Sequence, residues 1–340
     1  MEPKPTPHHL SEEDIISLVA SLAGGAGGEL AVGIGDDCAV LGGTQAGLVV
    51  TTDLLVEGVH FDLGLMSPAD VGHRAMAANL SDLAAMGAQP AWGFLSLGLP
   101  AGPRASFVEE LVGSMVNQGR AFGLKLAGGD TVRAPQVLIN LCLLGTMGNL
   151  APLLRSGGRL GDAVCVTGVL GGSAAGLAWL QAGGDPADPA AAPAVAAHRR
   201  PVPRVEAGRA LAASGRVHAM MDLSDGIASD LARLARASGL GARVEAESVP
   251  MDPAARAVAQ ALGADALGWA LAGGEDFELM FTCDPGEAPL LAELVAEAAG
   301  GLAVTQVSRL TPGPGVTLSR GGKKEPIGYM GYDHFRESAP

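Results

Sequence analysis

Apolar and polar positions follow one another along the chain in a pattern that predicts mixed α and β structure. Two runs rich in apolar and β-branched residues, 33–41 and 48–61, are typical of buried strands that end in acidic turns. At 67–87, Ser and Pro begin an alanine-rich stretch that Gly ends, which predicts a helix. The same pattern predicts strands at 92–100 and 137–148, a strand followed by a turn within 124–131, and helices at 106–122 and 203–214.

A turn-like stretch at 149–162 separates two such series of elements. A length of 340 residues suits two domains of about 150 residues each. We therefore expect an N-terminal domain at 1–149 and a C-terminal α/β domain at 150–340. The Pro- and Ala-rich segment 183–201 is expected to be an exposed excursion from the second domain.

The charge of the chain limits which kinds of molecule it can bind, and its cysteine content indicates its cellular compartment. The 36 acidic and 22 basic residues give a formal charge of −14, which repels nucleic acid and anionic membranes but attracts divalent cations. The four cysteines are dispersed, as buried thiols in a reducing compartment are. The first residues show no secretory pattern, and no apolar run approaches the roughly 18 residues of a membrane span. We expect a cytoplasmic protein with no nucleic-acid or membrane partner.

Aspartates gather at predicted strand ends and beside Gly, Ser or Thr. The set comprises Asp36, Asp37, Asp53, Asp82, Asp130, Asp222, Asp225 and Asp276. Such loops present functional groups, although Asp also favours turns and N-caps, which is the alternative interpretation. Carboxylates brought within a few Å of one another repel unless cations lie between them. Because the ligands on offer are oxygens, the cation favoured is Mg²⁺ rather than Zn²⁺.

Three neighbours of these acids are further candidates. Thr51 and Thr52 precede Asp53 and offer hydroxyl or carbonyl oxygens to the same site. Asn79 and Asp82 are three residues apart on the predicted helix and therefore share a face. The alternative is that Asn79 makes an interhelical hydrogen bond and that Asp82 is a solvated acid.

Known phosphate-binding motifs are absent, which leaves weaker candidates. There is no Walker A motif, and Cys38 stands where the third glycine of a dinucleotide fingerprint would fall. The stretch 167–177 runs from a strand through a Gly-rich turn into a helix, and either holds an anion or only packs closely. Arg155 is either a phosphate clamp or structural. His60 has no evident Ser or Cys partner, so it contacts a ligand or lies hydrogen-bonded in the core.

Seven motifs together carry a resemblance to a known family. They are GIGDDCAVL, TTDLLVEGVHF, NLSDLAAMGAQP, GGDT, DLSDGIASDL, GGEDFEL and the terminal GYDHF. In order, and over almost the entire chain, they resemble the thiamine-monophosphate kinases, whose superfamily includes aminoimidazole ribonucleotide synthetase and selenophosphate synthetase. The resemblance implies a two-domain, synthetase-like α/β fold whose N-terminal sheet pairs with its twin in a homodimer. It also implies Mg²⁺-dependent transfer of a phosphoryl group from ATP to thiamine monophosphate, giving thiamine diphosphate.

The resemblance also implies roles for individual residues. The metal ligands would be Asp37, Thr51, Thr52, Asp53, Asp82, Asp130, Asp222 and Asp225. The ATP contacts would be Gly129, Asp130, Arg155 and Ser224, and the thiamine contacts His60, Glu275 and Tyr332. The first domain would then bind metal and ATP and form the dimer, and the second would complete the nucleotide and substrate site. An aromatic residue that the family places near the nucleotide has no clear counterpart.

This chemistry explains many aspartates without a catalytic histidine. Phosphoryl transfer depends on alignment and on cations, and a phosphate acceptor is already anionic, so no base or nucleophile is expected. We expect direct in-line transfer with several Mg²⁺ ions. One alternative is a selenophosphate synthetase-like enzyme. Such chains usually carry a reactive Cys or selenocysteine with a nearby Lys early in the sequence, and here only Lys4 is found there. Another is a noncatalytic nucleotide- or metal-binding regulator, against which the complete acid set argues.

Overall fold

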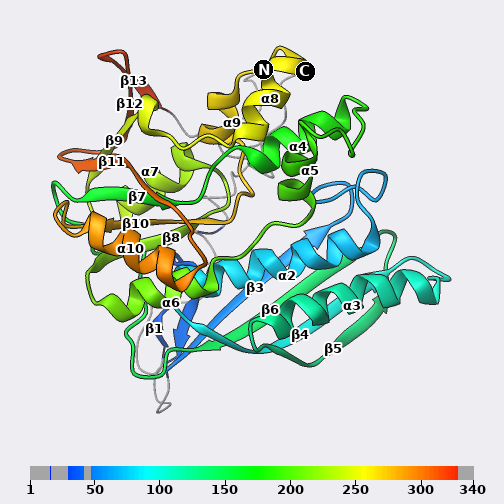
Figure 1. Cartoon of the computed structure of the whole chain (residues 1–340). Helices are drawn as coiled ribbons and strands as arrows, with labels where there is room; N and C mark the ends of the chain where they lie inside the picture. Colours follow the sequence, from blue (N-terminus) through cyan, green and yellow to red (C-terminus); the bar gives the residue numbers. More distant parts are fainter. Residues whose placement is uncertain (1–15, 17–29, 42–46, 328–340) are drawn as a thin grey trace, which may run out of the picture.

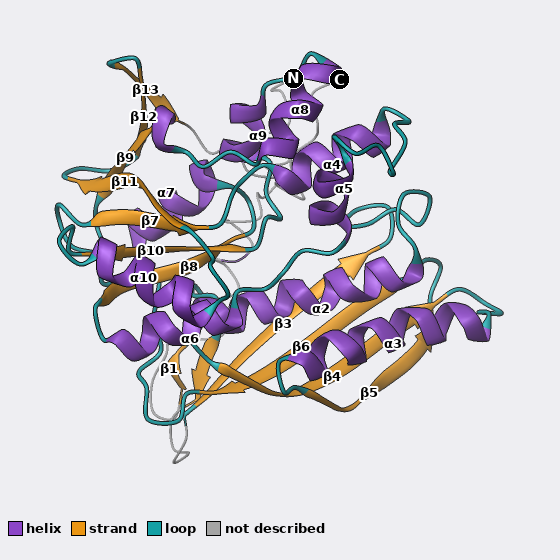
Figure 2. Cartoon of the chain, viewed as in Figure 1, coloured by secondary structure: helices purple, strands orange, loops and turns teal. Residues whose placement is uncertain are grey.

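The computed structural model of the chain describes residues 16, 30–41 and 47–327, which form two mixed β-sheets with helices between and around them (Figures 1 and 2). The six-stranded sheet has the order β1-β2-β3-β6-β4-β5. Its strands are β1 (Leu30–Val32), β2 (Ala39–Leu41), β3 (Leu48–Val56), β4 (Gln89–Leu99), β5 (Lys125–Arg133) and β6 (Leu138–Thr146).

The seven-stranded sheet has the order β13-β12-β9-β11-β7-β10-β8. Its strands are β7 (Ala163–Thr167), β8 (Val217–Leu223), β9 (Gly241–Glu245), β10 (Glu278–Cys283), β11 (Val304–Thr311), β12 (Val316–Arg320) and β13 (Lys323–Ile327). The predicted domain division at 149/150 falls in the connection between the last strand of the first sheet and the first strand of the second. The boundary itself stays a prediction.

Helices α2 and α3 lie side by side on one face of the six-stranded sheet (Figure 1). The described helices are α2 (Pro68–Ala85), α3 (Ala105–Ala121), α4 (Gly172–Gln181), α5 (Ala192–Arg199), α6 (Val205–Ser214), α7 (Ile227–Ala237), α8 (Pro253–Leu262), α9 (Ala266–Ala272) and α10 (Ala288–Ala298), with the 3₁₀ turn η1 (Ala246–Ser248). None of the helices in this part of the chain is long and apolar enough to cross a membrane.

Helix α2 begins and ends where its local sequence predicts. Ser67 caps the first turn, and its hydroxyl accepts from the Asp70 N–H while the Asp70 carboxylate accepts from the Ser67 N–H, a reciprocal capping box. Pro68 occupies the first turn, where no N–H is needed. Gly87 follows with a φ of 73°, which terminates the helix.

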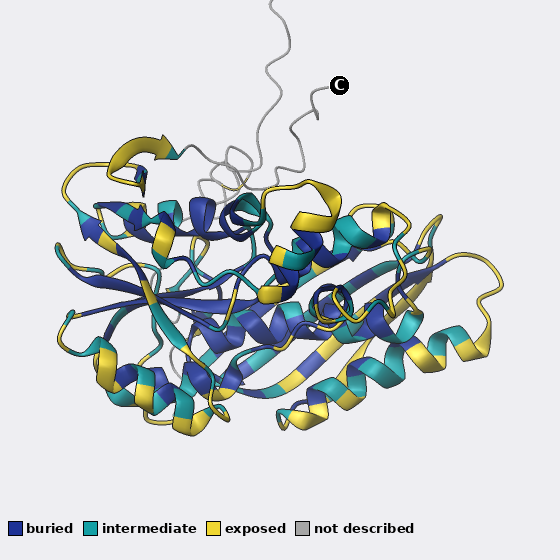
Figure 3. Ribbon diagram, turned by 45° about the horizontal axis from the view of Figure 1, so that its top comes forward, coloured by how far each residue is buried: buried dark blue, intermediate teal, exposed yellow. Residues whose placement is uncertain are grey.

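Helix α2 also joins the two sheets. It packs on β3 and β6 of the first sheet and on β8 of the second. Met76, Leu80 and Leu83 are fully buried, and each contributes about 1.5–3 kcal/mol by leaving water. One continuous apolar core therefore runs from one sheet through this helix to the other (Figure 3). The core fixes where residues on the helix stand relative to residues on the second sheet.

Three sequence predictions need correction. The predicted strand 33–41 does not form as one strand: β1 ends at Val32, β2 begins at Ala39, and Asp36 and Asp37 lie in the turn between them. The turn predicted within 124–131 is strand, because β5 continues from Lys125 to Arg133. The segment 183–201 is not simply an exposed excursion, since it contains α5, which packs on α4 so closely that a Cβ at Gly176 would lie 2.1 Å from the Ala194 carbonyl oxygen.

Candidate metal centre and its surroundings

Three aspartates from distant parts of the chain converge where the two sheets meet. Asp37 comes from the turn before β2, Asp82 from the last turn of α2, and Asp222 from the end of β8. Each offers a carboxylate oxygen, and these oxygens lie within 4.8 Å of one another. Asp37 and Asp222 are buried, with 8% and 3% exposure, and Asp82 is partly exposed. The cluster is therefore an internal concentration of negative charge.

Side chains on α2 and β3 orient this cluster. The Ser81 hydroxyl donates to Asp222 Oδ2 at 2.7 Å, and the Thr51 hydroxyl donates to Asp82 Oδ2. Asn79 Oδ1 accepts from the Asp53 N–H at 3.2 Å, which fixes the backbone of β3 against α2. The predicted shared face of Asn79 and Asp82 is confirmed as the face turned to β3, and the partner of Asn79 is a strand instead of another helix.

Arg155 supplies positive charge at one edge of the cluster. Its guanidinium donates to Asp37 Oδ1 at 2.6 Å from Nη2 and at 3.2 Å from Nε. Its backbone N–H donates to both carboxylate oxygens of Asp36, at 3.3 and 3.2 Å. The second oxygen of Asp37 is buried and has no hydrogen-bond partner among the described residues. A buried carboxylate oxygen in that state is short of a cation or a donor.

The raised pKa values of these carboxyl groups also indicate that the cluster lacks positive charge. Burial and then the charges of Asp53, Asp222 and Asp37 raise the pKa of Asp82 well above its usual range. Burial and then Asp37 do the same to the pKa of Asp222. Burial and the neighbouring Asp37 raise the pKa of Asp36 to about 6. An all-oxygen set with an unpartnered buried oxygen and mutual repulsion fits a hard divalent cation.

Asp225 is not among the three converged aspartates. The Arg233 guanidinium contacts Asp225 Oδ2, and the same Nη1 donates to Asp230 Oδ1 at 2.8 Å. The Asp225 N–H donates to Asp230 Oδ2 at 3.0 Å. Ser224, between the two aspartates of the motif, accepts through its carbonyl from the Glu275 N–H at 2.7 Å. The turn after β8 is thereby tied to the loop that carries Glu275.

The loop before β10 fills the Gly-rich helix start that was a candidate phosphate site. Asp276 Oδ2 accepts from the Gly171 N–H at 2.7 Å, and its Oδ1 accepts from the Ser173 N–H at 3.2 Å. Both donors lie at the N-terminus of α4, where the helix dipole favours a negative charge. The chain's own carboxylate therefore takes the place that an anionic ligand would occupy.

Asp130 lies apart from the converged aspartates. It is exposed in β5, where it pairs in register with Ser96 of β4. Ser96 pairs in turn with Asn140 of β6, and Asn140 pairs with Leu54 of β3. Three strand spacings separate β5 from β3, a distance of about 14 Å. Paired residues point to the same face, and Leu54 is 53% exposed on the face that the helices do not cover. Asp130 thus lies at the open side of the sheet, and Gly129 precedes it in β5.

The other predicted residues are distributed as follows. Thr52 is exposed, and its hydroxyl accepts from Asn140 Nδ2 at 3.0 Å, so it shares the open face with Asp130. His60 lies in the loop after β3, where its Nδ1 accepts from the Val56 N–H at 3.1 Å. Tyr332 lies outside the described residues. The single chain therefore brings together Asp37, Asp82 and Asp222, with Thr51 and Asp53 beside them.

Sequence reasoning missed several residues that shape the site. Ser81 sits beside Asp82 in the chain but points to Asp222, which only the packing of α2 against β8 reveals. Arg233 and Arg74 carry no motif signal, and each becomes important through its partner, Asp225 and Glu275 respectively. Which carboxylate an arginine pairs with can be seen only in the folded chain.

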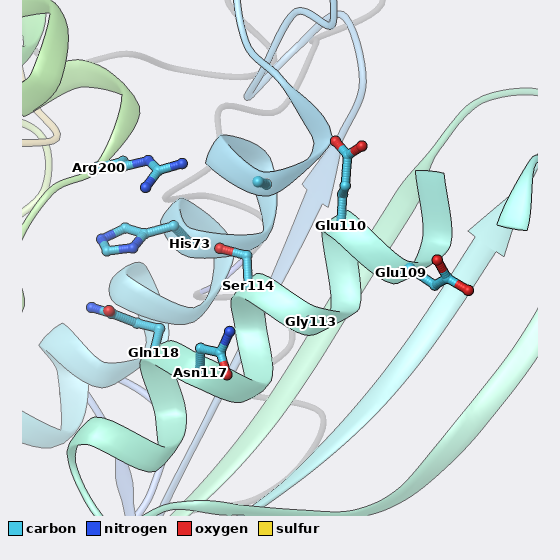
Figure 4. Close-up of a pocket in the computed structure, with 9 residues that line it drawn as sticks. His73, Glu109, Glu110, Gly113, Ser114, Asn117, Gln118 and Arg200 are labelled. Atoms are coloured by element: carbon cyan, nitrogen blue, oxygen red, sulfur yellow. The ribbon is translucent and has the colours of Figure 1, made fainter. Parts of the chain in front are cut away.

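A separate groove of about 450 Å³ lies over α2 and α3 (Figure 4). His73, Ser114, Gln118 and Arg200 are among its lining residues. The His73 Nε2 lies 2.9 Å from the Pro201 carbonyl oxygen, and burial lowers the pKa of its ring. None of the converged aspartates lines this groove. The candidate site is therefore the buried cluster and not this hollow.

Both halves of the chain match one protein family. Residues 35–147 match the AIR synthase related protein, N-terminal domain, and residues 159–320 match its C-terminal domain. The two mixed sheets and the aspartates between them therefore define a two-domain AIR synthase related protein.

Similarity to individual proteins narrows the class. Thiamine-monophosphate kinase of Escherichia coli (strain K12) is 40% identical over 311 residues, which cover 90% of this chain and 93% of that protein. The chain belongs to the thiamine-monophosphate kinase family. The structure of "AaThiL complexed with AMPPCP and TMP" superposes with a TM-score of 0.85 at 30% identity, over 98% of this chain and 99% of that one. Thiamine-monophosphate kinase from Stenotrophomonas maltophilia K279a gives 0.74 at 35% identity, over 89% and 93%.

Proposed function

We propose that this protein transfers the γ-phosphoryl group of ATP to thiamine monophosphate, with thiamine diphosphate and ADP as products. The observation that carries the proposal is the convergence of Asp37, Asp82 and Asp222 in a chain of the thiamine-monophosphate kinase family. The similar AaThiL structure, a complex with AMPPCP and TMP, supports a nucleotide and a thiamine phosphate as the two ligands.

The converged aspartates are the metal ligands of this proposal. Asp37, Asp82 and Asp222 would hold Mg²⁺, with Asp53 and the hydroxyl of Thr51 beside them. Bound Mg²⁺ supplies positive charge that neutralises phosphate oxygens during transfer. Ser81 and Thr51 keep the carboxylates of Asp222 and Asp82 in place before any ligand arrives. Prior orientation of this kind lowers the cost of binding.

Arg155 and Ser224 are the proposed nucleotide contacts within the protomer. The Arg155 guanidinium is 23% exposed and pairs with Asp37, so it stands at the edge of the cluster where a phosphate tail would reach. Burial opposes its charge, but Asp37 raises the pKa of Arg155, which therefore stays protonated. Ser224 follows β8 beside Asp222, on the turn that also carries Asp225.

The acceptor needs no proton removed, since a phosphate monoester is already anionic near neutral pH. This accounts for a site whose described residues include no histidine beside the converged aspartates. His60 keeps its Nδ1 on a backbone N–H and is proposed as a substrate contact. Glu275 is proposed to face the positively charged thiazolium ring, with Tyr332 as the further thiamine contact.

A homodimer is proposed through the open face of the six-stranded sheet. Trp92, Phe94 and Val132 are 46%, 43% and 55% exposed there, beside Leu54. An apolar patch of this kind on a sheet face is typical of a protein interface. Because Asp130 lies on the same face and about 14 Å from β3, we propose that it completes the site of the partner subunit.

The two domains then divide the work as the sequence predicts. The N-terminal part, 1–149, would hold metal and nucleotide and form the dimer, and 150–340 would complete the nucleotide and substrate site. Asp37 and Asp82 come from the first part and Asp222 from the second, so the proposed ligands need both parts.

A coupled assay for ADP with ATP, Mg²⁺ and either thiamine monophosphate or free thiamine tests the function. We expect turnover with the monophosphate and none with thiamine, because the acceptor must present a phosphate oxygen. Folded protein that binds nucleotide but is inactive with both would indicate a regulator. Turnover with selenide instead would indicate a synthetase of the same superfamily.

A further inference from the structure

Arg74 is an arginine buried inside the protein, and it reaches across the boundary between three segments. It lies on α2 and is 2% exposed. Its Nη1 donates to the His198 carbonyl oxygen at 2.8 Å and lies 3.1 Å from His198 Nδ1, on α5. Its Nη2 forms an ion pair with Glu275 Oε1, on the loop before β10. A buried charge that is so fully partnered is costly to replace, because each partner would lose its hydrogen bond.

The backbone at Glu275 leaves little freedom except in its side chain. Its φ is 59°, a left-handed conformation uncommon for a residue other than glycine, and its N–H donates to the Ser224 carbonyl oxygen. The next residue, Asp276, is fixed by the N–H groups of Gly171 and Ser173. With the main chain fixed on both sides, the direction of the Glu275 carboxylate depends on what holds its oxygens.

Glu275 is held on one side and open on the other. Arg74 takes Oε1, whereas the side chain of Glu275 as a whole is 36% exposed. A carboxylate has about four lone-pair positions on two oxygens, so one ion pair does not use its capacity. The exposed part of this carboxylate therefore leaves capacity for a further partner.

We infer that Arg74 is a positioning residue that holds the Glu275 carboxylate in the direction from which it meets the cationic ring of the substrate. The inference rests on the proposed function and adds to it a residue without substrate contact. Arg74 holds the Glu275 carboxylate in place before binding, so the substrate does not have to order it. His198 secures the other edge of the guanidinium.

The test is a comparison of KM values in Arg74→Met, Arg74→Lys and Arg204→Lys. Arg74→Met is expected to raise the KM for thiamine monophosphate about tenfold, with the KM for ATP within about twofold of wild type, because Glu275 is the proposed contact of thiamine monophosphate and not of ATP. Arg74→Lys keeps the charge but not the planar fork, and is expected to raise the same KM about threefold. Arg204→Lys is the matched control, since Arg204 is a half-buried arginine paired with Glu278. It is expected to lower the melting temperature without separating the two KM values.

A double-mutant cycle with Glu275→Gln distinguishes positioning from general damage. In that background Arg74→Met is expected to have no further effect on the KM for thiamine monophosphate. Equal rises in both KM values, or the full effect persisting with Glu275→Gln, would overturn the inference. If Arg74→Met does not fold, wild-type KM values in folded Arg74→Lys overturn it as well. A wild-type protein that never phosphorylates thiamine monophosphate overturns the proposed function, and this inference with it.

Discussion

At the scale of single residues, the site is a set of carboxylates whose negative charge the neighbouring side chains do not balance. Asp222 is 3% exposed and accepts one hydrogen bond, from Ser81. Burial and Asp37 raise its pKa well above the usual range, so ionisation at neutral pH costs folding free energy. Stability from this group is therefore lost as pH rises, and the proposed cation would restore it.

Asp222→Asn tests this charge balance. The amide still accepts from Ser81 but carries no charge, so we expect the metal-free protein to melt a few degrees higher, at about 2–4 °C per kcal/mol gained. We also expect the rise in melting temperature on adding Mg²⁺ to disappear, together with kinase activity. Asp185→Asn is the control, since Asp185 is an exposed turn aspartate and should leave both melting temperatures unchanged. A lower melting temperature for metal-free Asp222→Asn would contradict the account.

Single residues also show which parts of the site could be predicted from the sequence and which could not. The residue types and motifs placed Asp37, Asp82 and Asp222 in one candidate site, and the structure brings their oxygens within 4.8 Å. The ion pair between Arg74 and Glu275 was out of reach, because the two residues are about two hundred positions apart and neither has a local signal of its partner. Pairing of this kind depends on tertiary packing.

At the scale of elements, local signals placed α2 well and β5 badly. The Ser67–Pro68 start and the Gly87 end of the helix depend on neighbours in sequence. The Gly-Gly-Asp-Thr of β5 has turn composition, yet Gly129 is in a strand because its backbone lies against the Leu95 carbonyl. A glycine is needed at 129 for this close approach, and not for the turn that the composition predicts.

Gly129→Ala is expected to disrupt the edge of the first sheet. A Cβ there would lie 1.8 Å from the Leu95 carbonyl oxygen, at a φ of +154°, so strand β5 must move. We expect a loss of more than about 3 kcal/mol in the free energy of unfolding, measured with urea. Gly128→Ala is the control, because its Cβ would meet Phe94 at an ordinary 3.5 Å. Equal urea midpoints for the two variants would show that β5 does not lie against β4 as described.

Helix α5 is expected to make stability depend on pH through His198. Burial, and then Arg74 and Arg199, lower the pKa of His198 from 6.5 to about 3. The unfolded chain binds a proton near pH 6.5 and the folded chain does not, so this contribution to stability is present above pH 6.5 and falls by up to about 1.4 kcal/mol per unit below it.

His198→Asn tests that slope. The Asn Oδ1 can still accept from Arg74 but does not titrate, so wild type should lose stability relative to this variant as pH falls from 7 to 5. Urea unfolding at pH 7, 6 and 5 measures the difference. Two curves that stay parallel across this range would mean that His198 does not titrate on unfolding in the expected way.

At the scale of the whole molecule, the proposed site needs a second copy of the chain. That proposal rests on the open sheet face and on the distance of Asp130 from β3. Phe94→Glu should give a monomer in sedimentation velocity, because it places a charge in the apolar patch, and should lose kinase activity with the dimer.

Mixing two inactive variants tests the same claim from the site. When Asp130→Asn and Asp222→Asn protomers are unfolded, mixed and refolded, half of the dimers are mixed, and each has one site with both aspartates intact. We expect recovery of about one quarter of wild-type activity. No recovery, with mixed dimers verified by affinity tags, would place Asp130 and Asp222 of one protomer in the same site.

The measurement that bears most directly on the central claim follows the labelled γ-phosphoryl group of ATP in a single turnover. Excess protein with Mg²⁺, γ-³²P-labelled ATP and thiamine monophosphate should give labelled thiamine diphosphate, no labelled protein and no free labelled phosphate. The account predicts this because cations and positioned carboxylates align two phosphates without a nucleophile from the chain. Label retained on denatured protein, or released as phosphate without thiamine diphosphate, would contradict it.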